Sequence, residues 1–250
     1  MKVLITGASS GLGAEFARIL SKQGHDLILV ARRKKKLEDL AKELNTNVKI
    51  INMDISSTYN CMELYNQVKK EKIDILINNA GFGMFGKFDE TKIDKELDMI
   101  DLNIKTVHTL TKLFLKDFKK RDSGYILNVA SLAGFMPGPL MSTYYATKSY
   151  VLNLTTAINE ELKKDCSNVY IGALCPGPVD TEFNDVAKVE MKLKSLSSEY
   201  VANYAIKKMF KGKKIIVPGT TNKFVVCFSK ILPLGIMLKL SYRNQKKKEN

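Results

Sequence analysis

Histidine and cysteine, the residues that most often bind metal ions or form disulfides, are scarce in this chain of 250 residues. There are two histidines, His25 and His108, and four cysteines, at positions 61, 166, 175 and 227. The cysteines are widely separated and form no Cys-x-x-Cys pair, which excludes a zinc site of that kind and a disulfide framework. We therefore expect reduced thiols, no metal in the functional site and a cytoplasmic location.

Acidic residues are also in short supply. The chain has 26 Asp and Glu against 40 Lys and Arg, a formal net charge of +14 and a pI near 9.5. Such a charge attracts nucleotide phosphates, anionic lipid surfaces or nucleic acids. Most lysines are dispersed, as is typical of solvated helix faces, and the denser runs 32–36 and 246–248 contain no aromatic residues. We therefore expect no nucleic-acid partner.

Long uninterrupted apolar runs are missing. Residues 2–5 lead directly into a glycine-rich turn, so no signal peptide is expected. The most apolar segment, 224–240, contains two lysines and a proline and predicts no spanning helix. Together with the basic residues 241–250, it could line the substrate mouth, pack on a partner subunit or lie on an anionic membrane through residues 224–248. Packing against protein is favoured, because short apolar helices are usually buried.

A glycine-rich turn lies between the first expected strand, residues 3–5, and the first expected helix. Gly7 permits a tight turn, Gly11 allows the backbone to approach a pyrophosphate, and Gly13 allows the helix to pack closely on the strand. Strand, turn and helix together predict a dinucleotide phosphate site. The residues expected to contact the dinucleotide here are Gly7, Ser9, Ser10, Gly11, Leu12 and Gly13.

Two arginines, Arg32 and Arg33, follow the second expected strand, 26–31. In a dinucleotide-binding fold this strand end lies beside the adenine ribose, where an arginine accommodates the 2′-phosphate of NADP. We therefore predict NADP(H) rather than NAD(H), with Arg32 as the main selector. The alternative is that both arginines belong to the solvated start of a helix over 34–44.

Polar and glycine-containing turns follow three further expected strands, 48–53, 73–77 and 169–174. The carboxylate of Asp54 is placed either to accept a hydrogen bond from the adenine or, like Ser56, to cap the next helix. Gly81 leaves room for a ribose, and the proline-rich turn 175–181 places backbone groups beside a nicotinamide. The expected contacts are Asp54, Ile55, Asn79, Ala80, Gly81, Pro176, Gly177, Val179 and Thr181.

Tyr144 and Lys148 are four residues apart in a segment predicted to be helical over 144–164, so they share one face of the helix. A lysine ammonium favours the phenolate and lowers the pKa of a tyrosine, which makes a usable general acid and base. Ser131 follows the fifth expected strand, 125–129, and can donate a hydrogen bond to a substrate oxygen. Taken alone, the Tyr-x-x-x-Lys pattern is more often the start of a surface helix.

The chain alternates between expected strands and helices throughout, with no linker or repeat. This pattern predicts a single α/β domain, a doubly wound parallel sheet in three α/β/α layers (Rossmann), over residues 1–220, with 221–250 as an extension packed on it or on a partner. Two helices, 93–104 and 106–120, are expected to meet near Asn103. The polar stretch 182–197 is a candidate flap over the substrate. The expected apolar rim comprises Phe82, Met84, Phe85, Phe135, Met136, Leu140 and Met141, which favours a hydrophobic substrate.

Taken in order, these landmarks resemble the compact branch of the short-chain dehydrogenase/reductase family over residues 1–218. The matching pieces are Thr6-Gly7-x-x-x-Gly11-x-Gly13, Asp54, Asn78-Asn79-Ala80-Gly81, Asn103, Ser131, Tyr144-x-x-x-Lys148 and Pro176-Gly177 with Thr181.

The resemblance implies NADP(H)-dependent interconversion of a carbonyl and an alcohol. Tyr144 would be the acid and base, Ser131 would position the substrate oxygen, Lys148 would bind the nicotinamide ribose, and Asn103 would hold a water in a proton relay. Many NADP-preferring relatives have a basic residue where this chain has Ser10, so Arg32 must carry most of the preference. A homodimer or homotetramer through the helices near 106–120 and 145–164 is also implied. A non-catalytic NADPH sensor on the same fold is the alternative.

Overall fold

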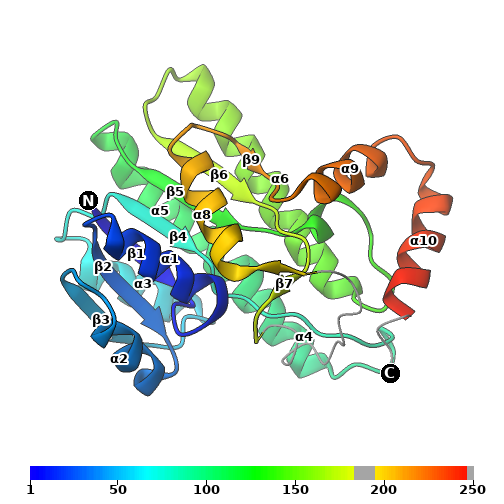
Figure 1. Ribbon diagram of the computed structural model, residues 1–250, viewed down its shortest axis with the longest axis horizontal. Coiled ribbons are helices and arrows are strands. Elements are labelled where there is room, and N and C mark those ends of the chain that lie inside the picture. Colours follow the sequence, from blue (N-terminus) through cyan, green and yellow to red (C-terminus); the bar gives the residue numbers. More distant parts are fainter. Residues whose placement is uncertain (183–194, 247–250) are drawn as a thin grey trace.

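The computed structural model describes residues 1–182 and 195–246. Seven parallel strands form one sheet, in the order β3-β2-β1-β4-β5-β6-β9 (Figure 1). The strands are β1 (Lys2–Thr6), β2 (Asp26–Ala31), β3 (Val48–Asn52), β4 (Ile75–Asn78), β5 (Tyr125–Val129), β6 (Tyr170–Leu174) and β9 (Ile215–Ile216). Because the strand order reverses between β1 and β4, their carboxyl ends border the crevice where ligands bind in such sheets.

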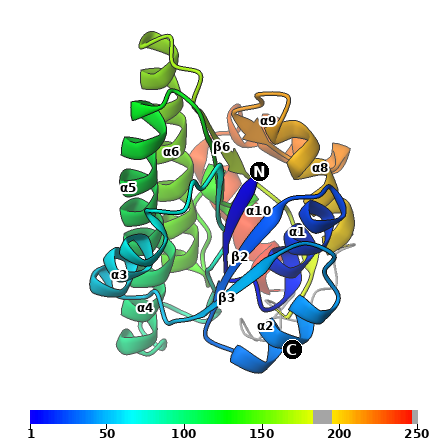
Figure 2. The ribbon, with the colours of Figure 1, turned by 90° about the vertical axis from the view of Figure 1, so that its left-hand side faces the viewer.

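Helices cover both faces of the sheet, so the predicted three-layer α/β/α fold is confirmed (Figure 2). One face carries α1 (Gly11–Lys22), α2 (Lys34–Lys42) and α8 (Ser198–Met209). The other face carries α3 (Thr58–Val68), α5 (Val107–Lys120) and α6 (Ser142–Lys164).

Strand β1 shows how the sequence builds both layers. Its side chains alternate between the two faces, so Val3 and Ile5 pack with α1 and α8, whereas Leu4 packs with α3 and α5. All three are fully buried. Because helices cover both faces of a central parallel strand, such a strand requires an apolar residue at every position.

The region before α5 differs from the two expected helices. Helix α4 (Ile93–Ile100) continues without a break through a π-helical turn, Asp101–Thr106, into α5. Asn103 lies inside this wide turn and is fully buried. The asparagine is therefore accommodated by widening the helix, not by ending it.

The remaining elements are short and lie toward the carboxyl half of the chain. A 3-10 turn spans Leu132–Phe135, and β7 (Val179–Asp180) pairs with β8 (Leu196–Ser197). Helices α9 (Thr220–Ser229) and α10 (Leu234–Lys246) follow β9. Most of the stretch 182–197, expected to form a flap, falls outside the described residues. Among the helices that the structure describes, none is both long and apolar enough to cross a membrane.

Candidate active site

The glycine-rich turn after β1 is held against the turn after β4. Gly7 and Gly11 have φ angles of +64° and +53°, which glycine adopts at little cost. A Cβ at Gly13 would lie 2.3 Å from the Gly7 carbonyl oxygen, so only glycine lets α1 pack this closely. Asn79 Nδ2 donates to the carbonyl oxygens of Thr6 and Gly7, at 3.0 and 3.1 Å. Asn79 therefore fixes the turn.

The amino end of α1 has the features of a phosphate site. Ser10 is its N-cap residue, but the Ser10 side chain makes no capping hydrogen bond to the first turn. Backbone amides at such an end attract anions. Thr181, which follows β7, lies across the turn, because a Cβ at Gly11 would be 3.1 Å from Thr181 Cγ2. The glycine turn and the residues after β7 thus border one site, and the cradle fits a pyrophosphate.

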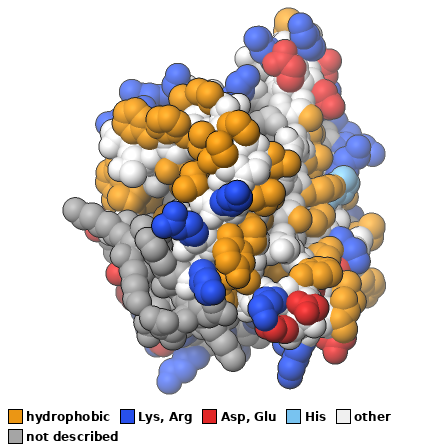
Figure 3. All heavy atoms as spheres, turned by 90° about the vertical axis from the view of Figure 1, so that its right-hand side faces the viewer, with side chains coloured by type: hydrophobic (Ala, Val, Ile, Leu, Met, Phe, Trp, Pro, Cys, Tyr) orange, Lys and Arg blue, Asp and Glu red, His pale blue; other side chains and the backbone are white. Residues whose placement is uncertain are grey.

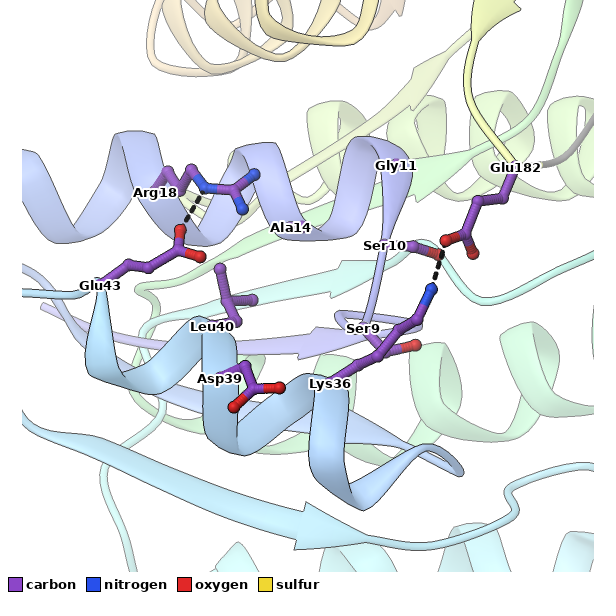
Figure 4. Close-up of a pocket in the computed structure, with 10 residues that line it drawn as sticks. All are labelled: Ser9, Ser10, Gly11, Ala14, Arg18, Lys36, Asp39, Leu40, Glu43 and Glu182. Carbon is purple, nitrogen blue, oxygen red and sulfur yellow. Dashed lines mark hydrogen bonds and ion pairs between the residues drawn. The ribbon is translucent and has the colours of Figure 1, made fainter.

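Beside this cradle is a hollow of about 320 Å³, whose lining includes Ser9, Ser10, Lys36 and Glu182 (Figure 4). Arg33 Nη1 lies 2.7 Å from Glu182 Oε2, and Lys36 Nζ contacts the other carboxylate oxygen. Arg33 Nη2 also donates to Ser9 Oγ at 3.0 Å and to Ser10 Oγ at 2.6 Å. Hydrogen bonds from Lys36 and Arg33 lower the pKa of Glu182 to about 2. The cluster is therefore an anion site that the protein's own carboxylate occupies.

Arg32, the predicted selector, lies apart from this cluster. Its Nη1 is 3.7 Å from Asp54 Oδ2, and its side chain is 71% exposed. Asp54 Oδ1 accepts a hydrogen bond from the Ser56 amide at 3.0 Å. The cap of α3 is Ser57, whose hydroxyl accepts from the Asn60 amide, so neither Asp54 nor Ser56 has the expected capping role.

Tyr144, Ser131 and Lys148 come together where β5 meets α6. Tyr144 and the Ser131 hydroxyl are hydrogen-bonded to each other, and Ser131 Oγ accepts a hydrogen bond from the Ala133 amide at 3.1 Å. Lys148 Nζ donates to the carbonyl oxygen of Val129 at 2.8 Å and lies 5.8 Å from the centre of the Tyr144 ring. Tyr144 and Lys148 are both buried, on one face of α6 as their spacing predicted.

Burial dominates the protonation of both groups. It raises the pKa of Tyr144 well above its usual value, although the hydrogen bond to Ser131 partly opposes this. It lowers the pKa of Lys148 to about 8, because the ammonium has lost most of its water. The net shift is therefore the opposite of the one expected from the spacing to Lys148, because desolvation outweighs any lowering of the Tyr144 pKa by the lysine charge. Tyr144 is a protonated hydrogen-bond donor at neutral pH.

The lowered pKa of Lys148 predicts a pH dependence of stability. Between its folded pKa of about 8 and its unfolded value of 10.5, the unfolded chain binds more protons, so this group's contribution to stability rises with pH. We expect the free energy of unfolding of the wild type, minus that of Lys148→Met, to increase by a few kcal/mol across this window. Urea unfolding at several pH values measures it. The exposed lysine variant Lys112→Met should give a constant difference, and a constant difference for Lys148→Met would contradict the prediction.

Asn103 links the π-helical turn to the same site. Its side-chain amide donates to the Phe82 carbonyl oxygen at 2.9 Å and to Thr147 Oγ1 at 3.1 Å, and accepts from the Phe82 amide at 3.1 Å. A Cβ at Gly81 would lie 2.8 Å from Asn103 Oδ1 and 3.5 Å from Lys148 Nζ. Wide turns of this kind are frequent at functional sites. Here the turn directs Asn103 to the backbone beside Lys148.

Apolar side chains pack around Tyr144. Phe82, Met84 and Phe85 contact the cluster that contains Tyr144 and the buried Met141. These four belong to the rim expected from the sequence, whereas Phe135 packs in a separate cluster with residues of β6 and α6. The proton donor therefore lies beside methionine and phenylalanine side chains.

Comparison with known proteins agrees with this geometry. Residues 1–191 match the family described as short chain dehydrogenase. The chain belongs to the short-chain dehydrogenase/reductase family. An uncharacterized oxidoreductase of Staphylococcus epidermidis is 35% identical over 185 residues, which cover 73% of this chain and 79% of that protein. A very-long-chain 3-oxoacyl-CoA reductase of Danio rerio is 30% identical over 207 residues, 80% of this chain and 64% of that protein.

A solved structure is similar over nearly the whole chain. It is a short-chain dehydrogenase from Sphingobium yanoikuyae in complex with NADPH, 30% identical, with a TM-score of 0.83 and 94% of each chain covered. As a member of this family, the protein is an oxidoreductase that acts on alcohols or carbonyls with NAD(P). This agrees with the expected enzyme and not with the non-catalytic sensor.

Three residues near the site were not singled out from the sequence. Lys36 is three residues after Arg33, so it lies near Arg33 in the first turn of α2, and this spacing was a usable signal. The sequence gives no comparable signal for Glu182 and Gln245. Glu182 contacts Arg33, and Gln245 contacts Tyr145, and the members of each pair are more than ninety residues apart in the sequence.

Proposed function

We propose that this dehydrogenase interconverts a carbonyl and an alcohol on an apolar substrate, with NADP(H) as the cofactor and Tyr144 as the general acid and base. The observation that carries the proposal is the hydrogen bond between Ser131 and the protonated, buried Tyr144, with Lys148 on the same helix face. Two hydroxyl groups at one point can both bind a single carbonyl oxygen.

The chemistry of the site follows from these groups. A bound nicotinamide would supply or accept the hydride. In the reductive direction, Ser131 donates a hydrogen bond to the carbonyl oxygen and stabilises the charge that develops on it. Tyr144 gives its proton to that oxygen, and in the oxidative direction it takes the proton back. Lys148, fixed by the Val129 carbonyl oxygen, holds a positive charge near the phenol below pH 8 and so assists loss of its proton.

The remaining predicted contacts keep the roles proposed for them. Gly7, Gly11 and Gly13 with the first turn of α1 would hold the pyrophosphate, and Gly81 beside Lys148 would face the nicotinamide ribose. We propose that Asn103 passes protons toward solvent through a water. This proposal is supported by its place next to Gly81 and Lys148.

We assign the choice of NADP(H) to Arg33, not Arg32. Arg33 and Lys36 supply two positive charges and Ser9 and Ser10 supply two hydroxyls, which together suit the 2′-phosphate of NADP. The carboxylate of Glu182 already holds both cations. We therefore propose that the 2′-phosphate competes with Glu182 for them.

This competition predicts a gain in affinity when the charge of Glu182 is removed. Glu182→Gln is expected to lower the dissociation constant for NADPH several-fold, because the phosphate no longer displaces a paired carboxylate, and to leave that for NADH nearly unchanged. Fluorescence titration measures both constants. Glu43→Gln, which removes a carboxylate paired with Arg18 in the same hollow, is the matched control. Weaker NADPH binding by Glu182→Gln would refute the competition.

The substrate class follows from the side chains around Tyr144. Phe82, Met84, Phe85 and Met141 favour an apolar carbonyl compound. A panel of aliphatic, aromatic and polycyclic ketones and aldehydes, with NADPH and NADH consumption followed separately, tests the proposal. We expect turnover of apolar ketones with NADPH. Cofactor binding without turnover of any of these classes would contradict it.

We further propose that the protein is cytoplasmic and self-associates through the outer faces of α5 and α6, as implied by the family resemblance. We also propose that residues 221–250 extend a catalytic domain formed by residues 1–220. The packing of this extension on the domain is supported by the hydrogen bond from Gln245 in α10 to Tyr145 in α6.

A further inference from the structure

Helices α9 and α10 are apolar on the outside. Phe224 and Phe228 of α9, and Ile231 in the connection that follows, are spaced four and three residues apart and are 66%, 57% and 73% exposed. None of the residues of α9 is buried. In α10 the two buried residues are polar, Ser241 and Gln245.

The two helices form a platform on the body of the protein (Figure 1). Gln245 Nε2 donates to the hydroxyl of Tyr145, the neighbour of Tyr144. Val226 of α9 packs against a core cluster that contains Val151 and Ala130. Asn222 Nδ2 donates to the Pro218 carbonyl oxygen at 2.7 Å. The exposed apolar side chains therefore belong to helices that contact the rest of the protein at several points.

The charge of this part of the chain has one sign. From Tyr200 to Lys248 the sequence contains twelve lysines and arginines and neither Asp nor Glu. On the two helices and their connection, Lys223, Lys230, Lys239 and Arg243 are all exposed. Figure 3 views this side of the molecule, where hydrophobic side chains gather in several groups with Lys and Arg side chains among them. Apolar side chains and cations thus share one surface.

We propose that α9 and α10 dock the protein on an anionic lipid bilayer. Helices that lie in a membrane interface combine exposed Phe and Leu with Lys and Arg, and they gain from both hydrophobic burial and attraction to acidic headgroups. A second copy of this chain fits less well. In a twofold dimer the same patch meets itself, so this surface would bring like charges together.

The position of the platform gives the docking a consequence. Tyr145 separates Gln245 from Tyr144, and the rings of the two tyrosines are 6.1 Å apart. Docking would therefore hold the bilayer on the side of the molecule next to the proton donor. Carbonyl compounds dissolved in the lipid are the substrates that this arrangement would favour.

Sedimentation of the full-length protein with vesicles tests the proposal. We expect binding to phosphatidylcholine vesicles that contain about 30 mol% phosphatidylserine, little binding to phosphatidylcholine alone, and weakening as the salt concentration rises toward about 0.5 M. Phe228→Ser combined with Ile231→Ser should lower the partition coefficient at least about tenfold. Lys230→Glu combined with Lys239→Glu should lower it by about fivefold or more for each charge.

Matched controls change the same residue types elsewhere. Phe88→Ser with Tyr59→Ser removes two exposed aromatic side chains, and Lys35→Glu with Lys70→Glu reverses two exposed charges away from α5 and α6. These controls should retain most of the binding, and thermal melting confirms that all variants fold. Equal losses in test and control variants would overturn the proposal. A fall in molar mass for Phe228→Ser with Ile231→Ser, without vesicle binding by the wild type, would show instead that the surface joins two copies of the chain.

Discussion

Replacing Tyr144 with phenylalanine is expected to lower kcat for carbonyl reduction by about 10²–10⁴-fold, the usual contribution of a general acid. The substitution removes the proton donor and keeps the ring in its buried cluster. Because Tyr144 and the cofactor cradle lie on different elements, the dissociation constant for NADPH should change little. Stopped-flow measurement of hydride transfer, combined with fluorescence titration of NADPH, separates the two effects.

The chain provides its own control for this experiment in the next residue. Tyr145 is another largely buried phenol on α6, but its hydroxyl accepts a hydrogen bond from Gln245 and its ring packs against Gly138. Tyr145→Phe removes a phenol of the same size and should retain most of the activity. If Tyr144→Phe kept near-normal turnover, or if both variants lost the same amount, Tyr144 would not be the acid.

The second large effect is expected at Arg33. Arg33→Ala should weaken NADPH binding by about 10- to 150-fold relative to NADH, because charge-assisted hydrogen bonds contribute about 1.5–3 kcal/mol. The ratio of kcat/KM for the two cofactors should fall by the same factor. Steady-state kinetics with each cofactor and one apolar ketone measures this ratio.

Arg32 is the matched comparison, because it is the same residue type one position earlier. Its side chain is mostly exposed and forms an ion pair with Asp54 at 3.7 Å, and exposed pairs of this kind contribute little. Arg32→Ala should change the cofactor ratio by less than about threefold. A larger loss at Arg32 than at Arg33 would restore the assignment made from the sequence and refute the one made from the structure.

The fold could be predicted because each of its parts has a local signal. Apolar runs such as 3–5 mark the central strands, and the glycine spacing fixes where β1 passes into α1. Tyr144 and Lys148 were placed together for the same reason, since residues four apart share a helix face. Local patterns were therefore enough to predict the central strands, the turn between β1 and α1, and the placement of Tyr144 beside Lys148.

What could not be predicted depends on contacts between distant segments. The choice between Arg32 and Arg33 depends on which side chain meets Ser9, Ser10 and Glu182, and neighbouring residues give no sign of it. The pKa of Tyr144 was predicted in the wrong direction, because the spacing to Lys148 is visible in the sequence whereas the loss of water around the phenol is not.

The wide turn at Asp101–Thr106 has a consequence for insertions and deletions. A π-helical turn holds one residue more than an α-helical turn, and each residue of an α-helix rotates its side chains by about 100°. Deleting one residue just before Asn103 would restore regular spacing between α4 and α5 and swing the asparagine amide away from Phe82 and Thr147. Loss of a single codon here would be more damaging than most substitutions, because it would shift the phase of one helix against the other.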